Sequence, residues 1–156
     1  MSLDGFSLLS SVLCEEVRQE SSGRAIIIGA MANGPIISDD AETKIRRLAL
    51  YLEVQMPTDK ISLYVRLIKT GSEDPVLYAD VDTAEIYDNM PDPDTLVKNP
   101  IAVVVMGRED FSIKGSGDYQ LQYATEEDNW KDYRVFFFPN EDMAEGSFPA
   151  EGMVES

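Results

Sequence analysis

The chain has 156 residues, a length typical of one domain. Its 13 basic and 29 acidic side chains give a formal net charge of −16, which argues against nucleic acid or an anionic membrane as a main partner, because both attract clustered lysine and arginine. The chain has no histidine and a single cysteine, Cys14. This composition excludes histidine-dependent catalysis, zinc sites that contain histidine, and intramolecular disulfides.

The sequence also predicts a compartment. Residues 1–17 contain neither the basic segment nor the long apolar stretch of a signal peptide. The longest apolar runs, 25–32 and 101–106, are far shorter than the roughly 20 residues that cross a bilayer. A single unpaired thiol is typical of a reducing compartment. We therefore expect a cytoplasmic protein that does not associate with a membrane.

Apolar and polar residues alternate along most of the chain, which predicts strands. In chain order, we expect strands over 6–17, 24–30, 46–56, 61–68, 75–87, 101–106, 119–123 and 133–138. Two stretches leave an alternative open. Residues 6–17 also fit a helical stripe, and a single helical turn over 41–45 is compatible with the residues before the third strand.

The connections and runs between these strands carry further expectations. The short polar segment Pro57–Lys60 between two alternating runs predicts that 46–56 and 61–68 form a β-hairpin. The continuously apolar run Ile101–Met106 predicts a central strand buried on both faces or a strand with little solvent contact. Three prolines in Asp88–Pro100 make a regular element there unfavourable, so we expect this loop to cross from one sheet to another.

About eight strands at intervals of roughly 10 to 20 residues are typical of a β-sandwich. We find no internal repeat and no composition change that would divide the chain into two folded domains. The sequence therefore predicts one all-β domain over residues 1–138. Residues 139–156 are acidic and lack periodicity, so we expect a flexible C-terminal tail.

Acidic residues gather at three places and raise the question of calcium, which binds six to eight oxygen ligands. The groups are Asp80, Asp82, Glu85, Asp88, Asp92 and Asp94; Glu126, Glu127, Asp128 and Asp132; and Glu109 with Asp110. None follows the spacing of an EF-hand loop. With 29 acids in 156 residues such clusters arise by chance, so a solvated acidic surface is the favoured interpretation and we assign no metal ligand.

The sequence contains no arrangement that indicates catalysis. Carboxylate pairs are too common in this chain for any one pair to be specific. The segment Gly115–Gly117 precedes a strand rather than a helix, which favours a turn over a phosphate loop. Cys14 lies among apolar neighbours and is expected to be a buried hydrophobe rather than a reactive thiol. We predict no catalytic residue, no cofactor-binding residue and no cofactor.

Aromatic residues are dense near the end of the predicted domain. Trp130, Tyr133 and the run Phe136–Phe138 are expected to pack mostly in the core. Because side chains alternate across a strand, at least one phenylalanine of this run falls on the opposite face. That ring would pack under the tail, cover the first strand or meet another subunit.

Several short segments together resemble a known family. They are residues 14–18 (CEEVR), residues 23–29 (GRAIIIG) and, later, Phe111 followed by residues 117–123 (GDYQLQY). They resemble a bacterial family of domains of unknown function, over most of residues 8–138, with departures in the loop 88–100 and the acidic tail. The resemblance implies an immunoglobulin-like β-sandwich, here of about 7–9 antiparallel strands with little helix, and supplies no catalytic residues. Independently, a glycine two residues before a tyrosine at the start of a late strand is typical of a tyrosine corner, in which the phenol of Tyr119 bonds to upstream backbone.

Taken together, these observations predict a non-enzymatic protein-interaction or accessory structural domain that binds an unidentified protein partner or itself. Spare aromatic residues and exposed sheet edges support this interpretation. The alternative is a calcium-dependent binding module that uses the acidic loops around 80–94, with Asp88, Asp92 and Asp94 as ligands. A carboxylate-based hydrolase ranks third.

Overall fold

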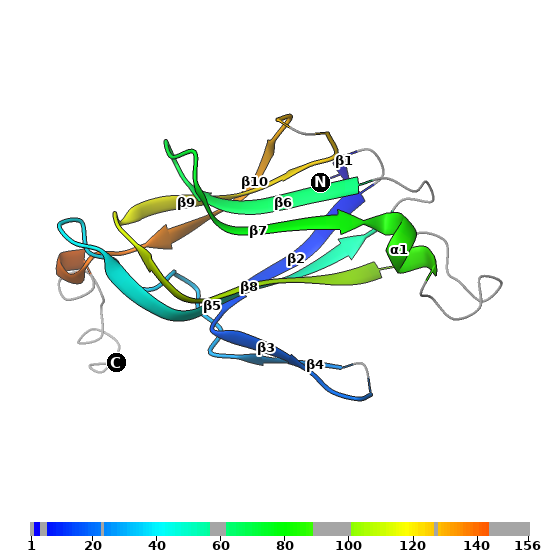
Figure 1. The fold of residues 1–156 in the computed structure, drawn as a ribbon, viewed down its shortest axis with the longest axis horizontal. Coiled ribbons are helices and arrows are strands. Elements are labelled where there is room, and N and C mark those ends of the chain that lie inside the picture. Colours follow the sequence, from blue (N-terminus) through cyan, green and yellow to red (C-terminus); the bar gives the residue numbers. More distant parts are fainter. Residues whose placement is uncertain are drawn as a thin grey trace, which may run out of the picture.

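The computed structural model describes residues 2–3, 6–22, 24–56, 62–88, 101–126 and 128–143, and nearly all regular structure in them is β (Figure 1). The strands are β1 (Ser2–Leu3), β2 (Phe6–Cys14), β3 (Glu16–Gln19), β4 (Ala25–Ile28), β5 (Thr43–Gln55), β6 (Ser62–Lys69), β7 (Pro75–Asp82), β8 (Ile101–Ile113), β9 (Gly117–Ala124) and β10 (Lys131–Phe138). One short helix, α1 (Thr83–Asp88), follows β7. The predicted all-β class is therefore confirmed.

The strands form two antiparallel layers and a separate hairpin (Figure 1). One sheet has the order β1-β2-β5-β8 and the other the order β10-β9-β6-β7. The edge strands β7 and β8 lie beside each other where the two sheets meet. Strands β3 and β4 pair only with each other among the described strands, and their hairpin lies below the first sheet in Figure 1.

A single hydrophobic core fills the space between the sheets. Alternate residues of each long strand enter it, as the period of two predicts. The central strands supply its middle: Leu50, Leu52 and Val54 from β5, Leu63, Val65 and Leu67 from β6, and Tyr119, Leu121 and Tyr123 from β9. Each fully buried side chain of this size contributes about 1.5–3 kcal/mol of hydrophobic stabilisation.

The alternation of buried and exposed side chains along β5 is interrupted at Arg46 and Arg47. Ile45 and Leu48 are both buried, while Arg46 and Arg47 between them are both exposed. On the paired segment of β8, Asp110 has φ +50, in the left-handed region that aspartate tolerates better than most residues. The irregularity places two consecutive arginines on the surface.

The predicted tyrosine corner is present at the start of β9. The hydroxyl of Tyr119 donates a hydrogen bond of 2.7 Å to the carbonyl oxygen of Gly115. The ring of Tyr119 stacks on Phe138 with 4.0 Å between centroids, which ties the start of β9 to the end of β10. The local sequence pattern was therefore sufficient to identify this contact.

The predicted hairpin of 46–56 with 61–68 is wrong. β5 pairs with β2 and β8 in one sheet, whereas β6 pairs with β7 and β9 in the other. Alternation shows which face of a strand is buried, and that face is the same whether the next strand continues the sheet or crosses to the opposite one. Residues 57–61, which connect β5 to β6, lie outside the described residues.

Four other expectations need correction. The run Ile101–Met106 belongs to an edge strand with one exposed face, not to a central strand buried on both faces. The predicted strand 75–87 ends at Asp82, whose Oδ1 accepts a hydrogen bond of 2.9 Å from the backbone N–H of Ala84 and so begins α1. The predicted strand 6–17 is divided at Glu15 into β2 and β3, and neither part is helical. Residues 41–45 form no helical turn, because β5 already begins at Thr43.

The start of the predicted tail contacts the rest of the domain. The backbone N–H of Ile37 donates to the carbonyl oxygen of Pro139 at 2.8 Å, and the Asn140 side chain donates to Asp39 at 3.0 Å. Residues 141–143 form a short helical turn. The rest of the predicted tail, 144–156, lies outside the described residues.

Replacing Tyr119 with phenylalanine removes the hydrogen bond to Gly115 and keeps the stacked ring. We expect Tyr119→Phe to lower the free energy of unfolding by about 1 kcal/mol, the net value of one hydrogen bond. The denaturant midpoint at neutral pH measures this change. An unchanged midpoint would show that the bond does not stabilise the corner.

The same side chain predicts a pH dependence. Burial raises the pKa of Tyr119 from its ordinary value of 10.0 to about 12. The unfolded chain therefore loses this proton first, so the stability associated with the neutral phenol is intact below about pH 10 and is lost between about pH 10 and 12. We expect the denaturant midpoint to fall less between about pH 9 and 11 in Tyr119→Phe than in the wild type. Equal losses in both proteins would contradict the assignment.

Candidate functional site

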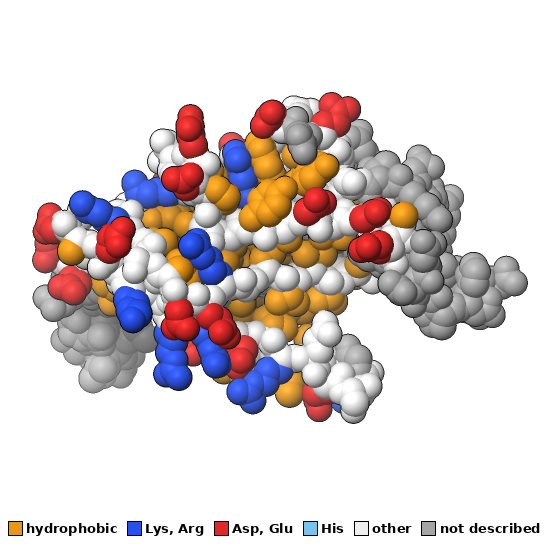
Figure 2. Space-filling view, viewed as in Figure 1, with side chains coloured by type: hydrophobic (Ala, Val, Ile, Leu, Met, Phe, Trp, Pro, Cys, Tyr) orange, Lys and Arg blue, Asp and Glu red, His pale blue; other side chains and the backbone are white. Residues whose placement is uncertain are grey.

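The outer face of β8 carries an exposed apolar row. Ile101, Val103 and Val105 are 57%, 43% and 38% exposed, whereas the alternating residues Ala102 and Val104 are buried in the core. In the described part of the chain β8 pairs only with β5, so no strand pairs with its other edge; β7 of the opposite sheet lies beside β8, and the Arg108 side chain donates a hydrogen bond of 3.3 Å to the carbonyl oxygen of Val76. Figure 2 shows hydrophobic side chains near the level of β8, beside a cluster of charged groups toward the β3–β4 hairpin.

The apolar row leads into a groove of about 480 Å³ between β3 and the outer face of β5 and β8. Val105, Gly107 and Ala49 line it from the sheet, and Val17 lines it from β3. A second hollow of about 450 Å³ shares two lining residues with this groove and continues past the start of β5; it is lined by Glu15, Met31, Pro35, Lys44, Ile45, Arg46 and Arg47.

The β3–β4 hairpin forms one wall of the groove and is attached to the sheet by backbone contacts. The N–H of Glu15 donates to the carbonyl oxygen of Ile28 at 3.0 Å, and the N–H of Met31 donates to that of Leu13 at 2.8 Å. Gly29 has φ +68, and a side chain there would overlap the side chain of Glu15. The close approach at Gly29 and its left-handed backbone both require glycine.

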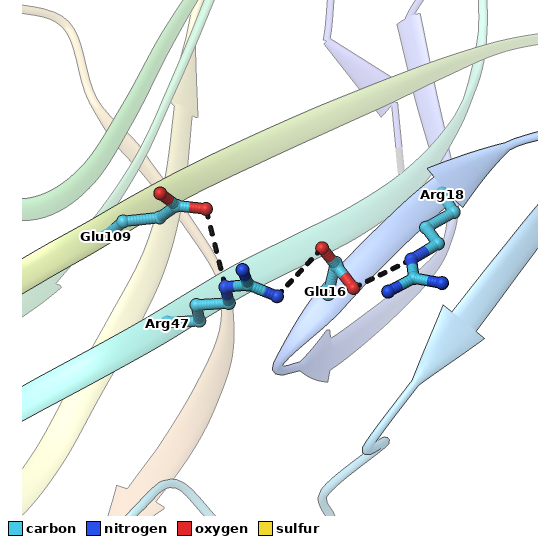
Figure 3. A network of polar contacts seen from close by, with 4 residues as sticks. All are labelled: Glu16, Arg18, Arg47 and Glu109. Carbon is cyan, nitrogen blue, oxygen red and sulfur yellow. Dashed lines mark hydrogen bonds and ion pairs between the residues drawn. The ribbon is translucent and has the colours of Figure 1, made fainter.

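A chain of ion pairs joins the hairpin to the sheet across the groove (Figure 3). Glu16 of β3 accepts hydrogen bonds from Arg18 at 2.9 Å and from Arg47 of β5 at 3.0 Å. The other side of the Arg47 guanidinium faces Glu109 of β8, with 3.4 Å between Nε and Oε1. Arg47 therefore links three strands, although each exposed pair contributes at most about 1 kcal/mol.

The neighbouring hollow has an excess of positive charge. Its lining includes three cations, Lys44, Arg46 and Arg47, and one carboxylate, Glu15. Arg47 is engaged in the ion-pair chain, whereas the side chains of Lys44 and Arg46 are exposed and have no polar partner within the described residues. This local excess contrasts with the net charge of −16 for the whole chain.

Gly107 is a glycine that the fold does not require. A Cβ atom added there would lie 3.9 Å from Cβ of Ala49 and 4.0 Å from the carbonyl oxygen of Leu48, which are ordinary contacts, and its φ is not in the left-handed region. Glycine inside a strand costs about 0.5–1 kcal/mol relative to alanine and often marks close approach of a ligand or another backbone. Its missing side chain keeps the groove open.

The predicted acidic clusters are not brought together as a metal site where the structure describes them. Within those residues no three histidine, cysteine, aspartate or glutamate side chains are placed to hold a metal ion. Glu109 pairs with Arg47, and Asp132 accepts a hydrogen bond of 2.8 Å from Gln122. Asp92, Asp94 and Glu127 lie outside the described residues and Asp88 is the last residue of α1, so the calcium alternative at 80–94 stays a prediction.

The aromatic residues mainly pack inside, as predicted. Phe136 and Phe138 are buried in the core, while Phe137 is half-buried on the opposite face of β10. Tyr133 meets the ring of Tyr123 edge to face, with 6.4 Å between centroids. Trp130 is half-buried beneath the guanidinium of Arg66, whose Cζ lies 4.1 Å from the ring centroid.

Cys14 is a buried hydrophobe, which confirms that expectation. Its thiol contacts the carbonyl oxygen of Ala49 at 3.6 Å, and burial raises the pKa of the thiol above its ordinary value. A raised pKa lowers the population of the reactive thiolate at neutral pH.

The groove and its ion pairs were not identified from the sequence, because Glu16, Arg47 and Glu109 lie on three strands far apart in the chain. One local signal was available. The consecutive polar residues Arg46 and Arg47 between the apolar residues Ile45 and Leu48 break the period of two, and such a break indicates an irregular strand.

Arg47 and Arg46 form a matched pair for testing the ion-pair chain. We expect Arg47→Met to lower the free energy of unfolding by no more than about 1 kcal/mol and to speed amide hydrogen exchange in β3 and β4 by about two- to fivefold, because the hairpin loses its side-chain link to the sheet. Arg46→Met removes a neighbouring exposed charge that has no polar partner among the described residues, and it should change neither quantity. Equal exchange in the two variants would contradict a tethering role for Arg47.

Comparisons with known proteins supply no assignment for this site. No family model matches the chain, and neither a curated protein nor a solved structure matches it. Among the described residues, α1 has six residues, and no helix has both the length and the apolar character that a membrane span needs.

Proposed function

We propose that this chain is a cytoplasmic, non-enzymatic protein-interaction domain with an immunoglobulin-like fold, and that it binds through β8. The surface consists of the exposed apolar row Ile101, Val103 and Val105, the free edge of the same strand, and the groove around Gly107; we refer to it as the β8 surface. The exposed row carries the proposal, because nothing in the core requires its side chains to be apolar.

The order of the strands supports an immunoglobulin-like topology. With β1 set aside, β2-β5-β8 correspond to strands A, B and E, and β10-β9-β6-β7 correspond to G, F, C and C′. The tyrosine corner lies at the start of β9, which is strand F in this correspondence. The resemblance to the bacterial family of domains of unknown function implies the same fold.

The character of the β8 edge supports a role in binding. Proteins commonly protect exposed strand edges with lysine, proline, bulges or very short strands. β8 is 13 residues long, and its first seven residues, 101–107, carry no charge. A long edge with apolar side chains on its exposed face is the arrangement to which another strand adds.

The charged groups in the groove favour a structural role over catalysis. Two of its three carboxylates, Glu16 and Glu109, are paired with Arg47. Pairing with Arg47 occupies both carboxylates within the protein, whereas general acid–base catalysis requires a group placed to exchange a proton with a substrate.

Val103 and Val135 provide a matched test. Both are exposed valines on edge strands, at 43% and 48%, but Val135 lies on β10 of the other sheet. We expect the wild-type protein either to form dimers by light scattering or to select peptides from a displayed random library. Val103→Lys should weaken that association at least tenfold, because an ammonium group would be desolvated in the interface, whereas Val135→Lys should not.

Circular dichroism and denaturant midpoints establish that both variants fold, as expected for exposed substitutions. Absence of both self-association and peptide selection would contradict the proposal. Equal losses in the two variants would contradict the assignment of β8 as the binding surface.

A further inference from the structure

We propose that the β8 surface binds an extended segment of another protein, whose apolar side chains occupy alternate positions and whose acidic side chains lie at one end. The segment adds as a strand to the free edge of β8, and one of its side chains enters the groove over Gly107. This inference rests on the proposed function and specifies its partner.

The first argument is the spacing along β8. Ile101, Val103, Val105 and Gly107 are alternate residues, so they follow one another on the same face of the strand. Three apolar side chains are thus followed by an open position that lies in the groove. An added strand presents its own side chains with the same period, so it matches this sequence of contacts.

The second argument is that the open position is not imposed by the fold. Among the six glycines of the described residues, four have positive φ, and Gly34 lies so close to the ring of Phe138 that a Cβ atom would overlap it. Gly107 has neither constraint. A Cβ atom at this position would make only ordinary contacts and would occupy part of the groove, so the glycine leaves room for a group that enters from outside.

The third argument is charge. Beyond Gly107, the neighbouring hollow exposes Lys44 and Arg46, which have no polar partner in the described part of the chain. Attraction to these two cations acts within the Debye length of about 8 Å at physiological salt, so it favours carboxylates at that end of a bound segment. A second copy of the chain is the less favoured occupant, because two copies with a formal net charge of −16 each repel more strongly than one copy and a short segment with a few carboxylates.

The test uses the full-length protein and a displayed library of random peptides about ten residues long. We expect peptides selected on the wild type to alternate apolar residues and to carry glutamate or aspartate at one end. Gly107→Leu should reduce their affinity at least tenfold while leaving the denaturant midpoint equal or higher. Gly107→Ala, which adds a single carbon, should have a smaller effect on affinity, and Val135→Lys should have none.

Charge reversal tests the orientation independently. The double variant Lys44→Glu, Arg46→Glu should select peptides with lysine or arginine at the end where the wild type selects acids. Tight binding to Gly107→Leu, or no charge preference in either selection, would overturn the inference. A dimer that is lost in Val103→Lys, together with failure to select any peptide, would also overturn it in favour of a second copy.

These outcomes separate the two proposals. The proposed function depends on loss of association in Val103→Lys but not in Val135→Lys, whatever the partner. The inference depends on the responses of Gly107→Leu and of the charge-reversed protein. Once the effect of Val103→Lys is known, the Gly107→Leu and charge-reversal results therefore support or contradict the inference separately from the proposed function.

Discussion

Burial of one face of every long strand between two sheets is the constraint on which the rest of the structure depends. Because side chains alternate, filling the core with Ala102, Val104 and Met106 forces Ile101, Val103 and Val105 to the other face of β8. These three side chains are exposed to solvent, and β8 is an edge strand of its sheet in the described structure. The core therefore explains where the row points but not why it is apolar, and this difference is the basis of the functional proposal.

The groove depends on a local departure from the same constraint. The break in alternation at Arg46 and Arg47 leaves both arginines outside, and Arg47 then reaches Glu16 on the hairpin and Glu109 on β8. These exposed ion pairs contribute little to the stability of the fold, and their main effect is to position the β3–β4 hairpin beside the groove. The positive φ of Asp110 occurs on the segment of β8 that pairs with this part of β5. A small irregularity in two neighbouring strands thus accompanies the charged link that Arg47 makes across the groove.

Local patterns predicted most of the strands and one tertiary contact. The period of two located β5, β6, β9 and β10, and the glycine before Tyr119 predicted its hydrogen bond to upstream backbone. Strand partners were not predictable in this way, since the face that a strand buries does not reveal which strand lies beside it. The apolar run Ile101–Met106 was misjudged for a related reason: an exposed valine on an edge strand has the same sequence signal as a buried one. The groove is formed by residues of three strands that are far apart in the sequence. The interrupted alternation at Arg46 was the one local sequence signal that indicated an irregularity there.

The central claim is that the edge of β8 is free for another strand, and amide hydrogen exchange of the dilute full-length protein tests it most directly. On an edge strand, alternate residues bond to the neighbouring strand while those between them direct their N–H groups outward. We predict alternating slow and fast exchange along residues 101–107, with the fast amides becoming slow when a selected peptide binds. Slow exchange at every one of these amides in the dilute, unbound protein would contradict the account, because it would mean that the edge is already covered.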